Sequence, residues 1–275
     1  MSVSTRTARP AAAVRRPGGV LRLRRALTIV GGFVAVVGLW WLAAGFYGMP
    51  MLFPGPPDVV TQFRSVLADG SLAQAVSASL GRVAAGLVLG SLLGTLLGLL
   101  SGSSRVLEAL LEPFISFFRF IPPLAWFAPI LLWFGAGEPA KLTLILYTTV
   151  FVVAVNTAAG VRAVPGNKLR MAATFGARPW QTFLLVRLPA SAAYILAGIR
   201  IALGNAFMTV VTAEMLGAPS GLGVIVTNGM ATTNIRGVFV ALITLGALGL
   251  IADRLFVALL RRFGARFGAS PDVAR

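Results

Sequence analysis

The sequence predicts an all-α membrane protein with six transmembrane helices, and three observations lead to this fold class. Hydrophobic residues make up 57% of the 275-residue chain and charged residues only 12%, with a mean hydropathy of +0.87, whereas soluble domains carry roughly a quarter charged residues. Apolar runs of about 20 residues, the length that crosses a bilayer as a helix, recur along the chain. Basic residues gather at the ends of these runs, which is typical of proteins oriented by cytoplasmic Lys and Arg.

The apolar runs define six spans and one membrane domain, residues 27–262. The spans are predicted at residues 27–46, 79–101, 121–135, 142–161, 190–216 and 238–260. In this register both termini are cytoplasmic, because only Arg64, Lys141 and Arg236 fall in predicted external segments.

The predicted tails are strongly basic. Residues 1–26 contain seven arginines and no acid, which predicts a disordered cytoplasmic tail, and residues 263–275 form a second cytoplasmic tail. A basic segment before an apolar run is also typical of a cleavable signal peptide, but the later spans favour an uncleaved first helix. The net charge of +16 raises nucleic-acid binding as an alternative. The basic residues are confined to the ends of apolar runs, so they are expected to orient the chain in the membrane. No nucleic-acid partner is predicted.

The first external connection and the second span have distinct patterns. Residues 47–74 contain four prolines, which predict an exposed connection with one short helix. In the second span a glycine recurs at every fourth position: Gly86, Gly90, Gly94, Gly98 and Gly102. These positions share one helical face, and glycines at this spacing let two helix backbones approach closely. We expect this face to be a helix-packing surface.

The third span begins at the adjacent residues Pro122 and Pro123. It is short for a bilayer, so we expect the helix that ends at Arg119 either to enter the membrane or to lie on its surface. A brief external link with Glu138 and Lys141 follows.

The longest internal loop, residues 162–187, is basic and contains no acid. Its composition predicts a helix over residues 168–175, ended by Gly176 in a left-handed turn. Pro179 suits the first turn of a second short helix. Pro189 is expected to mark the start of the fifth span.

Polar residues interrupt the fifth span. Asn205, Thr209 and Thr212 fall on one side of the helix, where they either face a translocation pathway or hydrogen-bond to neighbouring helices. Glu214, near the outer end, either belongs to an external gate or extends to the interface. Arg200 lies at membrane depth, where we expect bonds to backbone carbonyls, with attraction of an anion as the alternative.

Composition also excludes several chemistries. The chain has no Cys and no His, which removes disulfides, Cys/His zinc sites, thiol nucleophiles and Ser-His-Asp triads. Its only lysines, Lys141 and Lys168, do not follow a glycine-rich phosphate loop. The 8 acidic residues are scattered, so no membrane-embedded enzyme is predicted. We predict no catalytic residue, metal site or cofactor.

The internal loop resembles the coupling segment of ABC-importer permeases, which has Glu-Ala-Ala, three residues, Gly, and a downstream Leu-Pro. The matching segment has an Arg in place of the family Glu and keeps the Gly and Leu-Pro spacing. Its residues are Arg170, Met171, Ala172, Ala173, Gly176, Ala177, Leu188 and Pro189. The resemblance implies that this segment couples the chain to a cytoplasmic ABC ATPase, and Arg170 inverts the charge at one position of that contact.

The resemblance extends over residues 54–262 and is closest to the nitrate, sulfonate and taurine branch. The similar stretches are residues 54–57, 79–82, 119–122 with 133–135, 156–162, 198–200, 213–215 and 220–223. It implies a type I ABC importer permease fold in a bacterial cytoplasmic membrane and import of a small polar solute such as an aliphatic sulfonate, taurine or nitrate. The implied partners are the ATPase, an external substrate-binding protein and a second permease copy. The alternative is an ATPase-independent secondary transporter or channel, whose usual sign is an inverted repeat.

Overall fold

The computed structural model describes residues 19–215 and 217–263, and in these residues all regular structure is helical. The chain divides into two compact units, Met1–Pro56 and Pro57–Arg275. Five helices of the described part are long and apolar enough to cross a membrane, or six segments if one bent pair is counted as a broken span. The all-helical fold class is therefore confirmed.

The first unit is dominated by α1, Gly19–Tyr47. Its apolar part, Leu27–Tyr47, is a candidate span. The helix begins before the predicted end of the basic tail, while residues 1–18 of that tail, and the second tail beyond Phe263, lie outside the described residues. The helix ends where Gly48 takes a left-handed backbone with φ +63°, and the indole nitrogen of Trp40 donates to the carbonyl of Pro54 at 3.1 Å.

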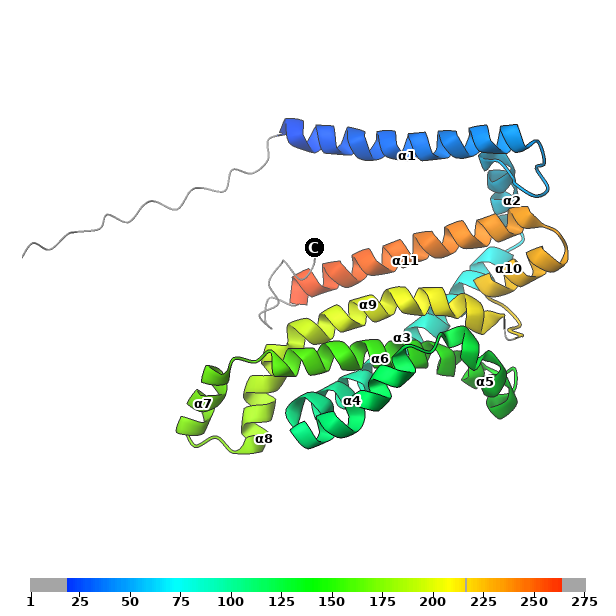
Figure 1. The fold of residues 1–275 in the computed structure, drawn as a ribbon. Helices are drawn as coiled ribbons and strands as arrows, with labels where there is room; N and C mark the ends of the chain where they lie inside the picture. The colour runs from blue at the N-terminus through cyan, green and yellow to red at the C-terminus, as the bar shows by residue number, and fades with distance from the viewer. Residues whose placement is uncertain (1–18, 216, 264–275) are drawn as a thin grey trace, which may run out of the picture. The chain divides into compact units, whose positions relative to one another are not determined.

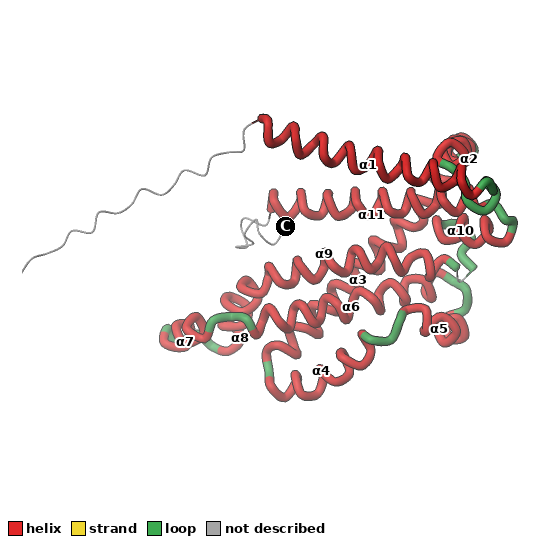
Figure 2. Tube along the Cα trace, turned by 45° about the horizontal axis from the view of Figure 1, so that its top comes forward, coloured by secondary structure: helices red, strands yellow, loops and turns green. Residues whose placement is uncertain are grey.

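The second unit contains the remaining helices, drawn in Figures 1 and 2. In chain order they are α2 Pro56–Ala68, α3 Ser71–Ser103, α4 Arg105–Arg119, η1 Pro123–Trp126, α5 Phe127–Phe134, α6 Glu138–Arg162, α7 Gly166–Thr174, α8 Pro179–Thr182, η2 Phe183–Arg187, α9 Leu188–Glu214, α10 Leu222–Ala231 and α11 Ile235–Phe263. The predicted short external helix corresponds to α2.

Helix α6 lies at the centre of this unit, with α3 packed along it on one side and α9 along another. Fully buried residues such as Leu144, Ile145, Ala206 and Val210 form the core between them. Helix α11 contacts α9. This three-helix centre fixes the positions of the polar groups described below.

The glycines of α3 form the contact with α6. A Cβ atom on Gly94 would lie 2.5 Å from the carbonyl oxygen of Val150, and one on Gly98 would lie 2.5 Å from that of Ala154. Since the obstructing atoms are backbone, no rotamer change could relieve the overlap. The glycine face therefore sets the distance between the two helices.

The third segment is not one straight helix. Helix α4 and the η1–α5 segment are bent by 92° relative to one another, and the loop at the bend is green in Figure 2. Helix α5 has only eight residues, too few to span a bilayer. The hydroxyl of Tyr147 in α6 donates to the carbonyls of Phe118 and Ile121 at the bend. Pro122 has no amide hydrogen to donate to the carbonyl of Phe118, and the hydroxyl of Tyr147 supplies a donor there.

Two elements differ from the sequence prediction. The sequence predicts no helix between the fifth and sixth spans, but residues 222–231 there form α10, an apolar ten-residue helix. The other difference is at the start of the fifth span, where helical backbone continues upstream of Pro189 as far as Pro179. Pro189 lies in the first turn of α9, as predicted, but the helical backbone is not interrupted there.

Candidate functional site

The predicted coupling segment forms a helical hairpin at one end of the second unit. Helices α7 and α8 lie together there, while α5 and α10 lie at the opposite end (Figure 1). The backbone of Gly176 has φ +71°, the left-handed conformation expected from the sequence. Its amide donates to the carbonyl of Ala173 at 2.9 Å, and the amide of Ala177 donates to that of Ala172 at 3.0 Å. This pair of bonds is a Schellman-type ending, which favours glycine because a side chain is strained there.

Several large apolar side chains are exposed on this hairpin. The exposed fractions are 59% for Met171, 85% for Phe175 and 57% for Trp180. Arg170 is exposed on the same short helix and makes no ion pair with any described residue. Exposed apolar side chains with a basic residue on the same short element are typical of a protein-docking surface.

A π-helical turn connects the hairpin to the fifth span. In η2 the amide of Leu188 donates to the carbonyl of Phe183, five residues earlier. Because Pro189 has no amide hydrogen, an ordinary α-helical bond is lost at this point, and wide turns of this kind absorb such a defect within a helix. The local geometry therefore explains how Pro189 is accommodated without a break.

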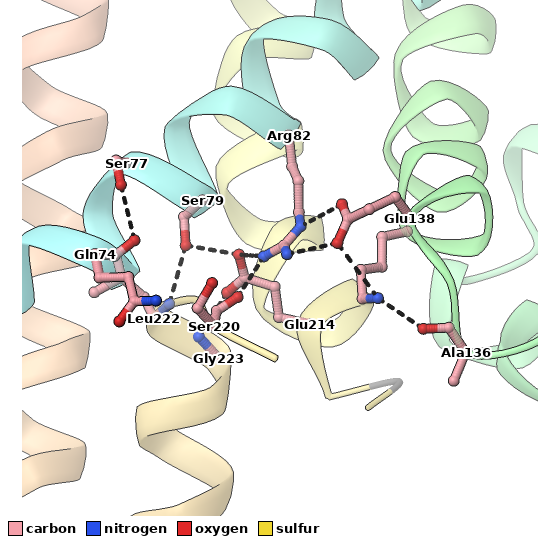
Figure 3. A network of polar contacts seen from close by, with 11 residues as sticks. Gln74, Ser77, Ser79, Arg82, Ala136, Glu138, Glu214, Ser220, Leu222 and Gly223 are labelled. Carbon is pink, nitrogen blue, oxygen red and sulfur yellow. Dashed lines mark hydrogen bonds and ion pairs between the residues drawn. The ribbon is translucent and has the colours of Figure 1, made fainter. Parts of the chain in front are cut away.

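A buried polar network lies at the opposite end (Figure 3). Arg82 of α3 donates to both carboxylate oxygens of Glu138, from Nε at 2.8 Å and from Nη2 at 2.7 Å. Its Nη1 donates to Oε1 of Glu214 at 2.8 Å and to the carbonyl of Ser220 at 2.6 Å. One guanidinium thus joins α3, α6 and α9 to the loop that precedes α10.

Glu214 is the best-satisfied carboxylate of the network. It accepts from the hydroxyl of Ser79 at 2.7 Å and from the amide of Gly223 at 2.7 Å, in addition to Arg82. Ser79 in turn accepts from the amide of Leu222 at 3.0 Å. Since Glu214 is only 1% exposed, the alternative in which it extends to the interface is wrong. Sequence reasoning did not pair it with Arg82, although a cation inside an apolar run needs such a partner.

Lys141 adds a second cation beside this network. It is 1% exposed, and its ammonium donates to the carbonyl of Ala136 at 2.8 Å and lies 3.6 Å from Glu138. The link between α5 and α6 is thereby fixed to the same end of the unit. The sequence placed both residues in this link but did not predict burial of the lysine.

Arg200 has a different partner from the one expected. Its Nε and Nη2 donate to the two carboxylate oxygens of Asp253 at 2.7 and 3.0 Å. This bidentate ion pair joins α9 to α11, so the expectation that Arg200 bonds to backbone carbonyls is wrong. The side chains are 28% and 34% exposed.

The four predicted pathway residues of α9, Asn205, Thr209, Thr212 and Glu214, do not all lie at one site. Asn205 and Thr209 line a cavity of about 270 Å³ together with Arg119 and Tyr147. Thr212 is half-buried and does not line this cavity, and Glu214 belongs to the network at the helix end. The structure therefore brings two of the four predicted pathway residues together.

Comparisons with known proteins agree with this architecture. Residues 86–265 match the family of binding-protein-dependent transport system inner membrane components. The chain belongs to this family. It is thus a multi-pass inner-membrane permease of an ABC transport system, with no ATPase site of its own, and the family implies an ATPase and a substrate-binding protein as partners.

Two relatives and one solved structure show the range of the similarity. The chain is 37% identical to the aliphatic sulfonates transport permease protein SsuC of Escherichia coli, over 80% of this chain and 84% of the relative. It is 31% identical to the bicarbonate transport system permease protein CmpB of Synechococcus elongatus, over 90% of this chain and 94% of the relative. A crystal structure of an amino acid ABC transporter with histidines has the same fold, with a TM-score of 0.57 at 19% identity, covering 75% of this chain and 96% of that one.

Proposed function

We propose that this permease forms the pathway by which an ATP-driven complex imports a small solute with an oxyanion group, with aliphatic sulfonates and the aminosulfonate taurine as the first candidates and nitrate or bicarbonate as others. The observation that carries this proposal is the similarity to permeases named for sulfonates and for bicarbonate. These solutes share a negative charge and several oxygen acceptors on a small group. The permease performs no covalent chemistry in this scheme.

Coupling to the ATPase is assigned to the α7–α8 hairpin. The exposed Met171 and Phe175 supply apolar contact area, and Arg170, Ala172, Ala173 and Ala177 complete the contacting segment. The rigid turn at Gly176 fixes how the hairpin is presented. Pro189 acts indirectly, through the continuous helix from α8 into α9. In family members with the usual Glu, a basic group of the ATPase is expected to face it. Because this chain has Arg170 instead, we expect an acidic or neutral group at that position of its ATPase.

The hairpin end is assigned to the cytoplasm. Arg105, Arg162, Lys168, Arg178 and Arg187 all lie in segments at this end, which agrees with retention of basic residues on the cytoplasmic side. With both termini also cytoplasmic, reporter fusions within residues 166–178 and after residue 263 should give the same cytoplasmic signal. An external signal from either position contradicts this orientation.

A second copy of the chain is proposed to complete the pathway. Irregular backbone at membrane depth is tolerated only where it is covered by protein or lines an aqueous cavity. The bend between α4 and η1 is such a place, and its residues Phe120 and Leu124 are 75% and 62% exposed. A partner copy that covers the bend would satisfy this requirement.

Reconstitution tests the function. The permease, its ATPase and its binding protein are placed in liposomes, and uptake of radiolabelled taurine, ethanesulfonate, nitrate and bicarbonate is measured with and without ATP. We expect uptake of at least one of these solutes only with ATP and with all three components. ATP-independent uptake by the permease alone would instead support the secondary transporter or channel, and transport of neutral solutes alone would remove the anion assignment.

A further inference from the structure

The bend between α4 and η1 lies at middle depth in the helix bundle. Tyr147, whose hydroxyl reaches the bend, is well inside α6, which runs from Glu138 to Arg162. Asn205, which lines the same cavity as Tyr147, is likewise well inside the continuous helix Pro179–Glu214. Broken helices at this depth are the usual framework of membrane binding sites, because they present polar groups where straight helices present none.

Arg119 brings a positive charge to this bend. It is the last residue of α4 and lines the cavity. No carboxylate of the described residues forms an ion pair with it, although Glu112 lines a small neighbouring cavity with it. Two arginines inside the predicted spans, Arg82 and Arg200, are each paired with a carboxylate. A cation without a carboxylate partner at membrane depth attracts anions.

The guanidinium of Arg119 also makes a cation–π contact. Its central carbon lies 4.7 Å from the centroid of the Phe120 ring. The N–H groups make no hydrogen bond to a described residue, and the fork that they form matches two oxygens of one oxyanion.

Asn205 provides a second donor in the lining of the same cavity. Its side-chain amide has no hydrogen-bond partner among the described residues, whereas the hydroxyl of the neighbouring Thr209 donates to the backbone of Asn205. An amide NH₂ without a partner can donate to an oxygen of a bound anion.

From these observations we propose that Arg119 and Asn205 form an anion-binding site at the bend of α4, which the transported solute occupies during passage. The ligand class is a small oxyanion, in which two oxygens accept from Arg119 and a third accepts from Asn205. The assignment of the ligand as transport substrate rests on the proposed function, while the site itself rests on the geometry of the cavity.

The test measures direct binding to the purified permease–ATPase complex in nanodiscs, without binding protein. Radiolabelled ethanesulfonate and bicarbonate are the probes, and ethyl methyl sulfone is a neutral competitor of similar shape. We expect one of the anions to bind the wild-type complex and Arg119→Gln to weaken this binding about ten- to hundredfold, the loss of a charge-assisted pair of hydrogen bonds. Arg119→Lys should retain part of the affinity, Asn205→Ala should weaken binding severalfold, and the sulfone should not compete.

Arg105→Gln is the matched control, since it removes a positive charge from the other end of the same helix. It should leave binding unchanged, and both glutamine variants should elute as folded complexes of wild-type size. The site is refuted if neither anion binds the wild-type complex, if Arg119→Gln binds as well as wild type, or if the sulfone competes equally. Uptake in the reconstituted system is a separate measurement, so a complex that binds an anion through Arg119 but transports none overturns only the transport function.

Discussion

Arg82 and Glu214 form an ion pair inside the helix bundle, with 2.8 Å between Nη1 and Oε1, although they are 132 residues apart in the chain. Their side chains are 7% and 0% exposed. Together with Ser79 they fix the end of α9 and the start of α10 against α3. The two residues therefore hold the end of the bundle opposite the α7–α8 hairpin in one arrangement.

Loss of the arginine should destabilise the permease more than loss of charge on the glutamate. Arg82→Met leaves Glu214 as a buried carboxylate without a cation, which costs about 3–5 kcal/mol. Glu214→Gln should cost only about 1–2 kcal/mol, because its amide oxygen still accepts a hydrogen bond and Arg82 keeps Glu138. Unfolding free energies of the purified variants in detergent measure both values.

Arg236→Gln is the control for this pair. Arg236 lies 3.7 Å from Asp58, and the two side chains are 47% and 35% exposed, so the change should cost no more than about 1 kcal/mol. An equal effect of Arg82→Met and Arg236→Gln would show that the buried network does not stabilise the fold.

Adding a methyl group to the glycine face should separate α3 from α6. Gly98→Ala would place a Cβ atom 2.5 Å from the carbonyl oxygen of Ala154, and such overpacking costs about 1–3 kcal/mol. Gly81→Ala on the same helix meets no atom within 4 Å and should be neutral or stabilising. The thermal unfolding temperatures of the two variants are compared directly. Equal temperatures would contradict the packing role of the glycine face.

A β-branched residue at position 176 should disturb coupling while leaving the membrane domain folded. Gly176→Val forces valine into the left-handed region, at a cost of about 1–2 kcal/mol, and the hairpin turn should change conformation to avoid it. We expect the ATPase to copurify poorly and ATP-dependent uptake to fall, with normal membrane insertion. Gly166→Ala, at the first residue of α7, is the control that should behave as wild type, because Gly166 has no atom within 4 Å of the added Cβ position and no left-handed backbone.

Reversing the ion pair between α9 and α11 should restore stability that either single change removes. Arg200→Asp or Asp253→Arg alone places two like charges together and should cost about 1–3 kcal/mol, and the double variant should recover most of this. A double-mutant cycle on unfolding free energies measures the coupling. A coupling energy near zero would mean that the two side chains interact only weakly in the membrane.

The general fold could be predicted because it follows from composition and local signals. Long apolar runs located the spanning helices, and the spacing of Gly86 to Gly102 marked the face that packs on α6. The backbone of Gly176 was also predictable, because a glycine after a short helix favours a left-handed ending. Each of these features depends on residues close together in the chain.

The partners of the charged residues could not be predicted in the same way. Arg82 pairs with Glu214, and Arg200 with Asp253, across long distances in sequence, and periodicity carries no information about such contacts. Helix α10 was missed because its glycines and the loops around it are typical of a link. The continuity of the helix at Pro189 was missed because it depends on the π turn, a departure from the usual α-helical bonding.

The π turn at Phe183–Arg187 carries helical backbone from α8 into α9 without a break, although the two helices point in different directions (Figure 1). Trp180 belongs to α8, whereas Asn205 and Glu214 belong to α9. A displacement of α8 is therefore passed to α9 through hydrogen-bonded backbone and not through a slack linker. The ion pair of Arg82 with Glu214 then sets how far the opposite end of α9 moves with it.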